Sequence, residues 1–193
     1  QVGQGRVDVE VADRRRQPLP ASQATRPAEE ERHVNEFFVK GLRMAQAAMG
    51  LARAGIRLGR LPHSDVPVYF LEYHRYFDRP FPYGPPGEGY ADNLERFAFL
   101  SRGALELCKA IGFEPDVINA NDWQTALVPV YVNTVEWAKP LHGAGTVFSI
   151  HNMAYQGVTD GGALFVTGLG REHYNANEFE HFGALNLTKA ALV

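Results

Sequence analysis

The sequence predicts an α/β fold with a mostly parallel sheet that helices cover on both faces. Two observations support this prediction. Strand-like and helix-like segments alternate along most of the chain, and parallel strands need crossover connections of this kind. The predicted strands are also short, continuous apolar runs, which are typical of strands buried on both faces.

The N-terminal part of the chain is the least regular. Residues 7–11 (VDVEV) alternate apolar and polar side chains and predict a half-buried strand. Residues 12–33 hold almost no large apolar side chain and predict a long loop or a disordered segment. Apolar side chains then recur every three to four positions over 34–52, which predicts an amphipathic helix. We therefore separate residues 1–33, a strand with an inserted or disordered loop, from a main domain over 34–193.

The middle of the chain has clearer patterns. Residues 66–71 (VPVYFL) predict a strand with Pro67 near its start or on an edge, because proline cannot donate to the ladder. A loop rich in proline, glycine and aromatic residues follows. Asp92 and Glu95 have the spacing of a capping box, which predicts the start of a helix that ends at Gly112.

Three further segments complete the predicted fold. Residues 116–120 and 145–150 predict two short buried strands, and a helical stretch over 122–138 lies between them. Residues 185–193 begin another helix. The single cysteine, Cys108, falls inside the earlier helix, which excludes an internal disulfide and favours a buried thiol over a nucleophile.

The composition is that of an ordinary globular domain and excludes several classes of partner. The net charge is −3, whereas nucleic-acid-binding domains usually present a basic face. No apolar run approaches the roughly 18 residues of a membrane span. The seven histidines are scattered, and no metal-ligand spacing is visible. We therefore expect no nucleic acid, no membrane and no metal.

Two polar clusters follow the two short buried strands. Asn121, Asp122 and Gln124 come after the first strand, and His151 and Asn152 come after the second. The carboxyl ends of strands in such a sheet converge on a crevice where ligands bind. Amide, carboxylate and imidazole groups are suited to hydrogen-bonding sugar hydroxyls. The sequence therefore predicts a polar ligand crevice at this edge.

Structural roles compete with ligand binding at the same residues. Asn121 and Asp122 each fit the N-cap of the following helix, and Asn121 with Gln124 has capping-box spacing. A histidine such as His151, taken alone, is more often structural than catalytic. Asn152 also suits a turn. The pattern alone leaves both interpretations open.

Five segments resemble, in the same order, segments of bacterial glycogen synthases and plant starch synthases. Residues 116–131 (DVINANDWQTALVPVY) resemble the family segment H-A-H-D-W-H/Q-x-x-L, and residues 146–157 (TVFSIHNMAYQG) resemble T-V/I-H-N-L-A-Y-Q-G. Shorter matches are YFDRP at 76–80, YADNLERF at 90–97 and HFGALNLTKA at 181–190. Their shared order supports the resemblance more strongly than any one motif.

The resemblance implies one half of a two-domain glycosyltransferase fold. Two Rossmann-like domains would enclose the active site, and residues 34–193 would be a truncated N-terminal catalytic domain. The implied reaction is a retaining glucosyl transfer from ADP-glucose to the non-reducing end of an α-1,4-glucan, without metal or cofactor. The implied location is the bacterial cytoplasm, or the plastid in a plant.

The resemblance also implies roles for the polar clusters. His151 and Asp122 would be catalytic, and the backbone carbonyl of His151 would lie near the positive charge that develops on the sugar. The implied substrate-binding residues surround these two: Asn152, Tyr90, Asn121 and Gln124.

Some family features have no counterpart in this sequence. These are the N-terminal Lys-x-Gly-Gly-Leu loop and the C-terminal nucleotide-binding domain, and Asn121 replaces the first histidine of the His-Asp-Trp motif. We therefore expect the chain alone to be an inactive fragment. Two alternatives remain, a non-catalytic α-glucan-binding or regulatory module and a relative that uses UDP-glucose.

Overall fold

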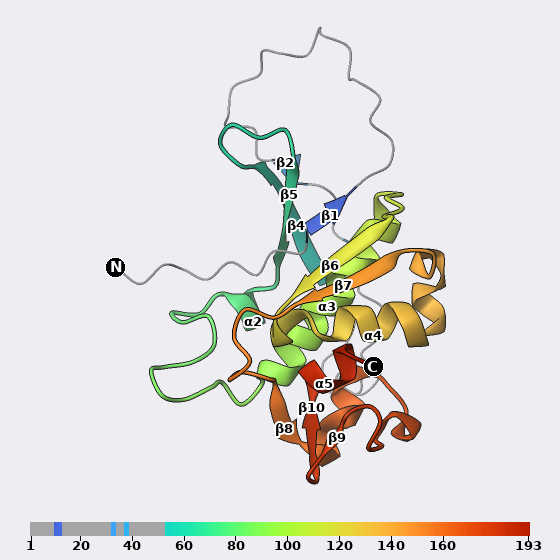
Figure 1. Cartoon of the computed structure of the whole chain (residues 1–193). Helices are drawn as coiled ribbons and strands as arrows, with labels where there is room; N and C mark the ends of the chain where they lie inside the picture. Colours follow the sequence, from blue (N-terminus) through green and yellow to red (C-terminus); the bar gives the residue numbers. More distant parts are fainter. Residues whose placement is uncertain (1–9, 13–31, 34–36, 39–52) are drawn as a thin grey trace, which may run out of the picture.

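A parallel pair of strands, β6 and β7, forms the centre of the molecule (Figure 1). The computed structural model describes residues 10–12, 32–33, 37–38 and 53–193. β6 (Val117–Asn121) and β7 (Gly145–Ser149) pair in register, so that Asn121 lies opposite Ser149. Both predicted short strands and the α/β class are therefore confirmed. The other strand pairs among the described residues are antiparallel.

The connection from β6 to β7 is helical, as predicted, but it is divided into three pieces. These are η2 (Trp123–Thr125), α4 (Leu127–Thr134) and η3 (Glu136–Leu141). Leu127 and Val128 of α4 are at most 1% exposed, because this helix packs against both strands of the pair. This crossover allows the two strands to run parallel.

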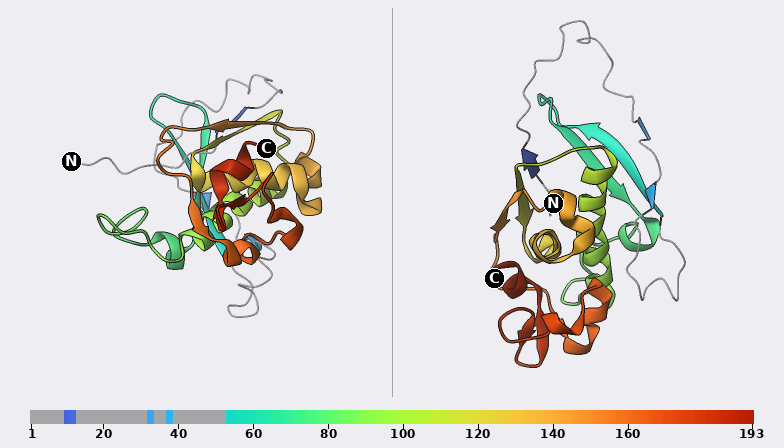
Figure 2. Two further views of the ribbon diagram at one scale, coloured as in Figure 1. Left: turned by 60° about the horizontal axis from the view of Figure 1, so that its bottom comes forward. Right: turned by 90° about the vertical axis from the view of Figure 1, so that its right-hand side faces the viewer.

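The long helix α3 (Asn93–Ala110) forms a second helical layer beyond α4. The right-hand view of Figure 2 shows α4 and then α3 between the β6–β7 pair and the β4–β5 hairpin. The opposite face of the pair leaves Val117 39% and Val147 48% exposed. The predicted helical cover of both faces is therefore not seen over these two side chains in the described part of the chain.

Of the predictions for the two ends of α3, one is confirmed and the other is wrong. Gly112 follows the helix with φ +65°, as predicted for a glycine C-terminal to a helix. The predicted capping box is wrong. The carboxylate of Asp92 pairs with the guanidinium of Arg79, and Glu95 accepts a hydrogen bond from the hydroxyl of Tyr76 at 3.1 Å. Both side chains therefore hold the segment that precedes the helix instead of the helix end.

A second sheet corrects one helix prediction. Phe37 and Phe38 form β3 (Phe37–Phe38), which pairs with β4 (Arg53–Arg60), so these two residues are not helical. The other residues of the predicted helix, 34–36 and 39–52, lie outside the described residues. β4 itself was not predicted, since glycines and arginines alternate with its buried Ala54 and Ile56.

The strand predicted at 66–71 is confirmed as β5 (Pro67–Glu72), an antiparallel partner of β4 that begins at its proline. β2 (Arg32–His33) pairs with β4, and β1 (Glu10–Ala12) pairs with β6 and overlaps the predicted first strand. A short helix, α2 (His74–Phe77), then leads into the loop before α3.

The C-terminal region is a small antiparallel sheet with short helices. Its elements are β8 (Val158–Asp160), η4 (Gly161–Thr167), η5 (Arg171–His173), β9 (Glu180–His181), β10 (Ala184–Asn186) and α5 (Leu187–Ala191). The helix predicted from residue 185 begins at Leu187, because Leu185 and Asn186 pair as strand with β8. The side chain of Asn186 instead caps the helix by accepting from the N–H of Lys189.

Candidate functional site

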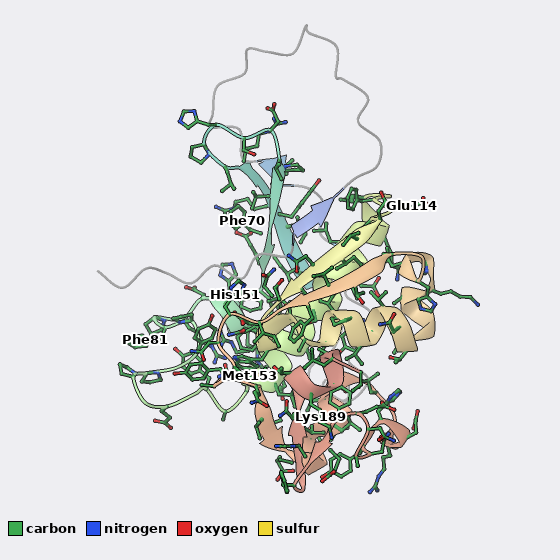
Figure 3. All side chains as sticks on the ribbon, viewed as in Figure 1. Phe70, Phe81, Glu114, His151, Met153 and Lys189 are labelled. Atoms are coloured by element: carbon green, nitrogen blue, oxygen red, sulfur yellow. The ribbon has the colours of Figure 1, made fainter. Side chains whose placement is uncertain are left out.

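The two predicted polar clusters meet at one edge of the β6–β7 pair. Because these strands are parallel and in register, their carboxyl ends stop side by side. The N–H of His151 donates to Oδ1 of Asp122 at 2.7 Å, and Nε2 of His151 lies 3.0 Å from Oδ1 of Asn121. The sticks in Figure 3 place the exposed His151 at this end of the pair. Asn121, Asp122 and His151 thus form one hydrogen-bonded group.

Asp122 has an unusual backbone conformation. Its φ of +55° and ψ of 177° lie near a region that L-residues other than glycine avoid, at a cost of about 1–3 kcal/mol. Three groups fix it there: the carbonyl of Ser149 accepts its N–H at 2.8 Å, Thr125 donates to its carbonyl, and His151 binds its carboxylate. Strain held in this way is typical of functional sites.

The capping interpretation of this cluster is wrong. The side chains of Asn121 and Asp122 both contact His151, and that of Asp122, the N-cap residue of η2, makes no capping hydrogen bond. Thr125 supports the turn instead, through a 2.7 Å bond from its hydroxyl to the carbonyl of Asn121. The two polar side chains therefore remain directed at the edge of the β6–β7 pair where the polar clusters meet. We call this edge the rim.

The loop after β7 is held by its own side chains. Oδ1 of Asn152 accepts from the N–H of Ala154 at 2.9 Å, so this residue supports a turn. Gln156 donates to the carbonyl of Met153 and accepts from Nδ2 of Asn186 at 2.7 Å. Asn152 and Met153 are exposed, and Figure 3 labels Met153 between His151 and the C-terminal sheet. Hydrogen bonds from its own side chains thus fix the loop that follows β7.

Gln124 and Tyr90 lie apart from the hydrogen-bonded group. Gln124 is only 6% exposed and faces the interior on η2. Tyr90 lies in the loop before α3, with the guanidinium carbons of Arg79 and Arg96 at 4.6 and 5.1 Å from its ring centroid. The structure thus brings together three of the six predicted site residues by direct hydrogen bonds, with Asn152 adjacent in the chain.

One residue near the rim was not identified from the sequence. Burial and the carboxylate of Asp122 both raise the pKa of the Tyr83 hydroxyl. The ring of Tyr83 lies 6.1 Å from that of Phe97, which meets Trp123 edge-on at 4.8 Å. The only signal for Tyr83 in the sequence is the aromatic content of its loop.

Other kinds of site were also considered. Within the described residues, no group of three histidine, cysteine or carboxylate side chains lies close enough to hold a metal ion. In the same part of the chain, no helix is both long and apolar enough to cross a membrane.

Comparison with known proteins identifies the family. The model of the starch synthase catalytic domain matches residues 7–193. Glycogen synthase 1 of Geobacter metallireducens is 49% identical over 145 residues, which are 75% of this chain and 29% of that protein. Glycogen synthase 1 of Geobacter sulfurreducens is 48% identical over the same length and shares. The chain therefore spans less than a third of these relatives.

A solved structure supports the same conclusion. The catalytic domain of Starch Synthase IV from Arabidopsis thaliana, bound to ADP and acarbose, matches with a TM-score of 0.66 and 28% identity. The match covers 84% of this chain and 32% of that chain. The fold, the two polar clusters and these sequence matches agree, and the chain belongs to the starch synthase catalytic domain family.

Proposed function

We propose that this chain is the acceptor-side part of a glucosyltransferase that extends α-1,4-glucans. In the proposed reaction, the bond from glucose C1 to the nucleotide breaks and a bond from C1 to the acceptor 4-hydroxyl forms. The hydroxyl proton leaves with the nucleoside diphosphate, and the configuration at C1 is retained. The observation that carries this proposal is the hydrogen-bonded group of Asn121, Asp122 and His151 in a chain of this family.

The backbone of His151 has the central role in this proposal. Its carbonyl would stabilise positive charge on the sugar as the bond to the nucleotide breaks. The carboxylate of Asp122 accepts the N–H of the same residue at 2.7 Å, which fixes the backbone on the N-terminal side of that carbonyl. The strained backbone of Asp122 and its three anchors make the arrangement rigid before substrate binds.

The surrounding polar residues would bind the sugar hydroxyls. We assign this role to Asn121 and Asn152 at the rim and to Tyr90 in the loop before α3. Gln124 is buried, so it would act from beneath the rim. No cofactor takes part in the proposed reaction.

The donor we propose is ADP-glucose. The related catalytic domain of Starch Synthase IV was solved bound to ADP and acarbose, which supports an adenosine nucleotide. The nucleotide would bind mainly to a second domain, as the family resemblance implies. We accordingly expect the 193-residue chain alone to bind glucan without transferring glucose.

A chimera tests this proposal. The chain replaces the matching segment of Glycogen synthase 1 from Geobacter metallireducens, and transfer to glycogen is measured with ADP-glucose and with UDP-glucose. We expect transfer from ADP-glucose that Asp122→Ala abolishes. Transfer from UDP-glucose but not from ADP-glucose would show that the proposed donor is wrong. Glucan binding without transfer would favour a non-catalytic module, and neither binding nor transfer would overturn the proposal.

A further inference from the structure

The carbonyl of His151 belongs to a planar peptide group, so its position depends on the backbone before and after it. Before it, the N–H of His151 is fixed by the carboxylate of Asp122 at 2.7 Å. After it, residues 152–157 cross from β7 to β8 without belonging to a helix or strand. The hydrogen bonds of this loop therefore decide how firmly the carbonyl is held on its second side.

The side chain of Gln156 spans this loop. Its Nε2 donates to the carbonyl of Met153 at 3.0 Å, and its Oε1 accepts from Nδ2 of Asn186 at 2.7 Å. Its own carbonyl accepts the N–H of Thr188 at 3.1 Å. Both ends of the amide are thus used, and one residue joins the loop to the start of α5. A reversed amide would face an oxygen with its oxygen and a donor with its nitrogen.

Asn186 sets the direction of that amide. It is 1% exposed, its Oδ1 accepts from the N–H of Lys189 at 2.9 Å, and its backbone N–H donates to the carbonyl of Phe179 at 2.8 Å. Because the oxygen is engaged in the cap of α5, the Nδ2 group is the one that faces Gln156. A buried donor without a partner is costly, so this pairing keeps Gln156 in one orientation.

The residue after Gln156 is packed closely on both sides. Gly157 has a φ of +64°, and a Cβ added there would lie 2.7 Å from Cε3 of Trp123 and 3.1 Å from Cβ of Leu187. Trp123 begins η2 directly after Asp122, and Leu187 is the first residue of α5. The end of the loop therefore lies between η2 and α5, which leaves Gln156 little freedom to move.

We infer that Gln156 is a positioning residue for the His151 carbonyl and that Asn186 sets the orientation of its amide. Asp122 fixes the backbone before this carbonyl, and Gln156 fixes the backbone after it through Met153. The side chain of Gln156 is bound to Met153 and Asn186, so it acts through the loop. This inference rests on the proposed function, because it assumes that the His151 carbonyl takes part in glucosyl transfer.

The first measurement reports the order of the loop in the complete chain, labelled with nitrogen-15. Gln156→Met keeps the length of the side chain and removes both of its hydrogen bonds. We expect the backbone order parameters of residues 152–154 to fall from about 0.85 to below about 0.6. Tyr131→Phe is the matched control, since it also removes a side-chain donor from a carbonyl, that of Thr167 at 2.6 Å. The control should leave these order parameters unchanged.

The second measurement gives the rates of the same variants in the chimera with Glycogen synthase 1, corrected for the folded fraction. Gln156→Met should lower kcat by about tenfold and leave the KM for ADP-glucose and glycogen within about twofold of wild type, because it misplaces a group near the reacting atoms and removes no substrate contact. Tyr131→Phe should keep the wild-type kcat.

Asn186→Asp tests the second part of the inference. It keeps an oxygen for the N–H of Lys189, and so the cap of α5, but offers no hydrogen to Gln156. We expect the same fall in kcat as in Gln156→Met. The double variant should lose no more than either single variant, since both act through one hydrogen bond to Met153.

The outcomes separate this inference from the proposed function. No transfer by the wild-type chimera would overturn the proposed function and the inference with it. Transfer with a wild-type kcat in Gln156→Met, or a raised KM at unchanged kcat, would overturn the inference alone. Equal losses of kcat in Gln156→Met and Tyr131→Phe would show that Gln156 acts only through stability. A wild-type kcat in Asn186→Asp would overturn the role of Asn186.

Discussion

The N–H of His151 donates a 2.7 Å hydrogen bond to Oδ1 of Asp122 and thereby joins the ends of two parallel strands. This bond depends on an oxygen acceptor at position 122 and does not require a charge. Asp122→Asn keeps such an acceptor, whereas Asp122→Ala removes it. The pair of variants therefore separates positioning of His151 from electrostatic stabilisation.

In the chimera with Glycogen synthase 1, we expect Asp122→Ala to lower kcat by at least about a hundredfold, since small misplacements in an active site cost this much. Asp122→Asn should retain clearly more activity. Initial rates with ADP-glucose and glycogen give the comparison. Equal loss in both variants would show that the carboxylate charge matters more than the hydrogen bond.

Gly157 allows a test of the packing beneath the rim. Its φ is +64°, and an added Cβ would lie 2.7 Å from Cε3 of Trp123. Gly157→Ala should therefore destabilise the chain by about 2–3 kcal/mol, through backbone strain and overpacking. Urea denaturation measures the change.

The matched control is Gly112→Ala, because Gly112 has a similar φ of +65° and an added Cβ there meets nothing within 4 Å. This variant should lower the free energy of unfolding by about 1 kcal/mol, through backbone strain alone. If the two variants are equally destabilised, the predicted contact with Trp123 does not matter.

The ion pair of Arg79 and Asp92 should give a pH-dependent contribution to stability. Its hydrogen bonds to Arg79 lower the pKa of Asp92. Ionised Asp92 therefore stabilises the fold above the unfolded pKa of about 3.9, and this contribution is lost as the pH falls through the lower folded pKa. Asp92→Asn should lower the free energy of unfolding by about 1 kcal/mol at pH 7, a size typical of partly exposed ion pairs. The loss should be much smaller near pH 2.

Urea denaturation at several pH values measures the difference between wild type and Asp92→Asn. Asp78→Asn is the control, since Asp78 and its partner His74 have side chains that are 80% and 89% exposed. A constant difference for Asp92→Asn from pH 7 to pH 2 would contradict the proposed linkage.

The strands and their polar ends could be predicted from the sequence because their signals are local. Continuous apolar runs marked β6 and β7, and the residues that follow each run converged as expected from parallel pairing. Contacts between distant segments could not be predicted. Phe37 and Phe38 have helical spacing but pair with β4, and Asp92 has capping spacing but binds Arg79.

The candidate site was predictable to a similar extent. Asn121, Asp122 and His151 were found because each follows a strand directly. Tyr83 was missed because its position depends on hydrogen bonds from Arg96 and Asn93 to loop carbonyls, and these leave no periodic pattern.

Cys108 should be unreactive in the folded chain. Burial raises the pKa of its thiol to about 11, and only 8% of the residue is exposed. Since the thiolate is the reactive form, alkylation at pH 8 should be on the order of a hundredfold slower than that of an ordinary cysteine. Iodoacetamide labelling followed by mass spectrometry, with and without urea, measures this ratio. Equal rates in both conditions would show that the thiol is accessible in the native fold.

The hairpin between β9 and β10 contains a residue that should limit stability. His181 pairs with Ala184, so Phe182 and Gly183 form a two-residue turn with φ values of +51° and +81°. Such turns favour Asn-Gly, because asparagine tolerates positive φ better than a bulky residue. Phe182 is 95% exposed and gains little from packing.

Phe182→Asn should therefore raise the free energy of unfolding by about 0.5–1 kcal/mol. Gly183→Ala provides the opposite control, since alanine at a φ of +81° should destabilise the chain by about 1 kcal/mol or more. Thermal and urea denaturation of both variants at pH 7 give the two changes. A loss of stability in Phe182→Asn would show that the aromatic ring, which meets His181 edge-on at 4.7 Å, stabilises the hairpin more than its backbone strain costs.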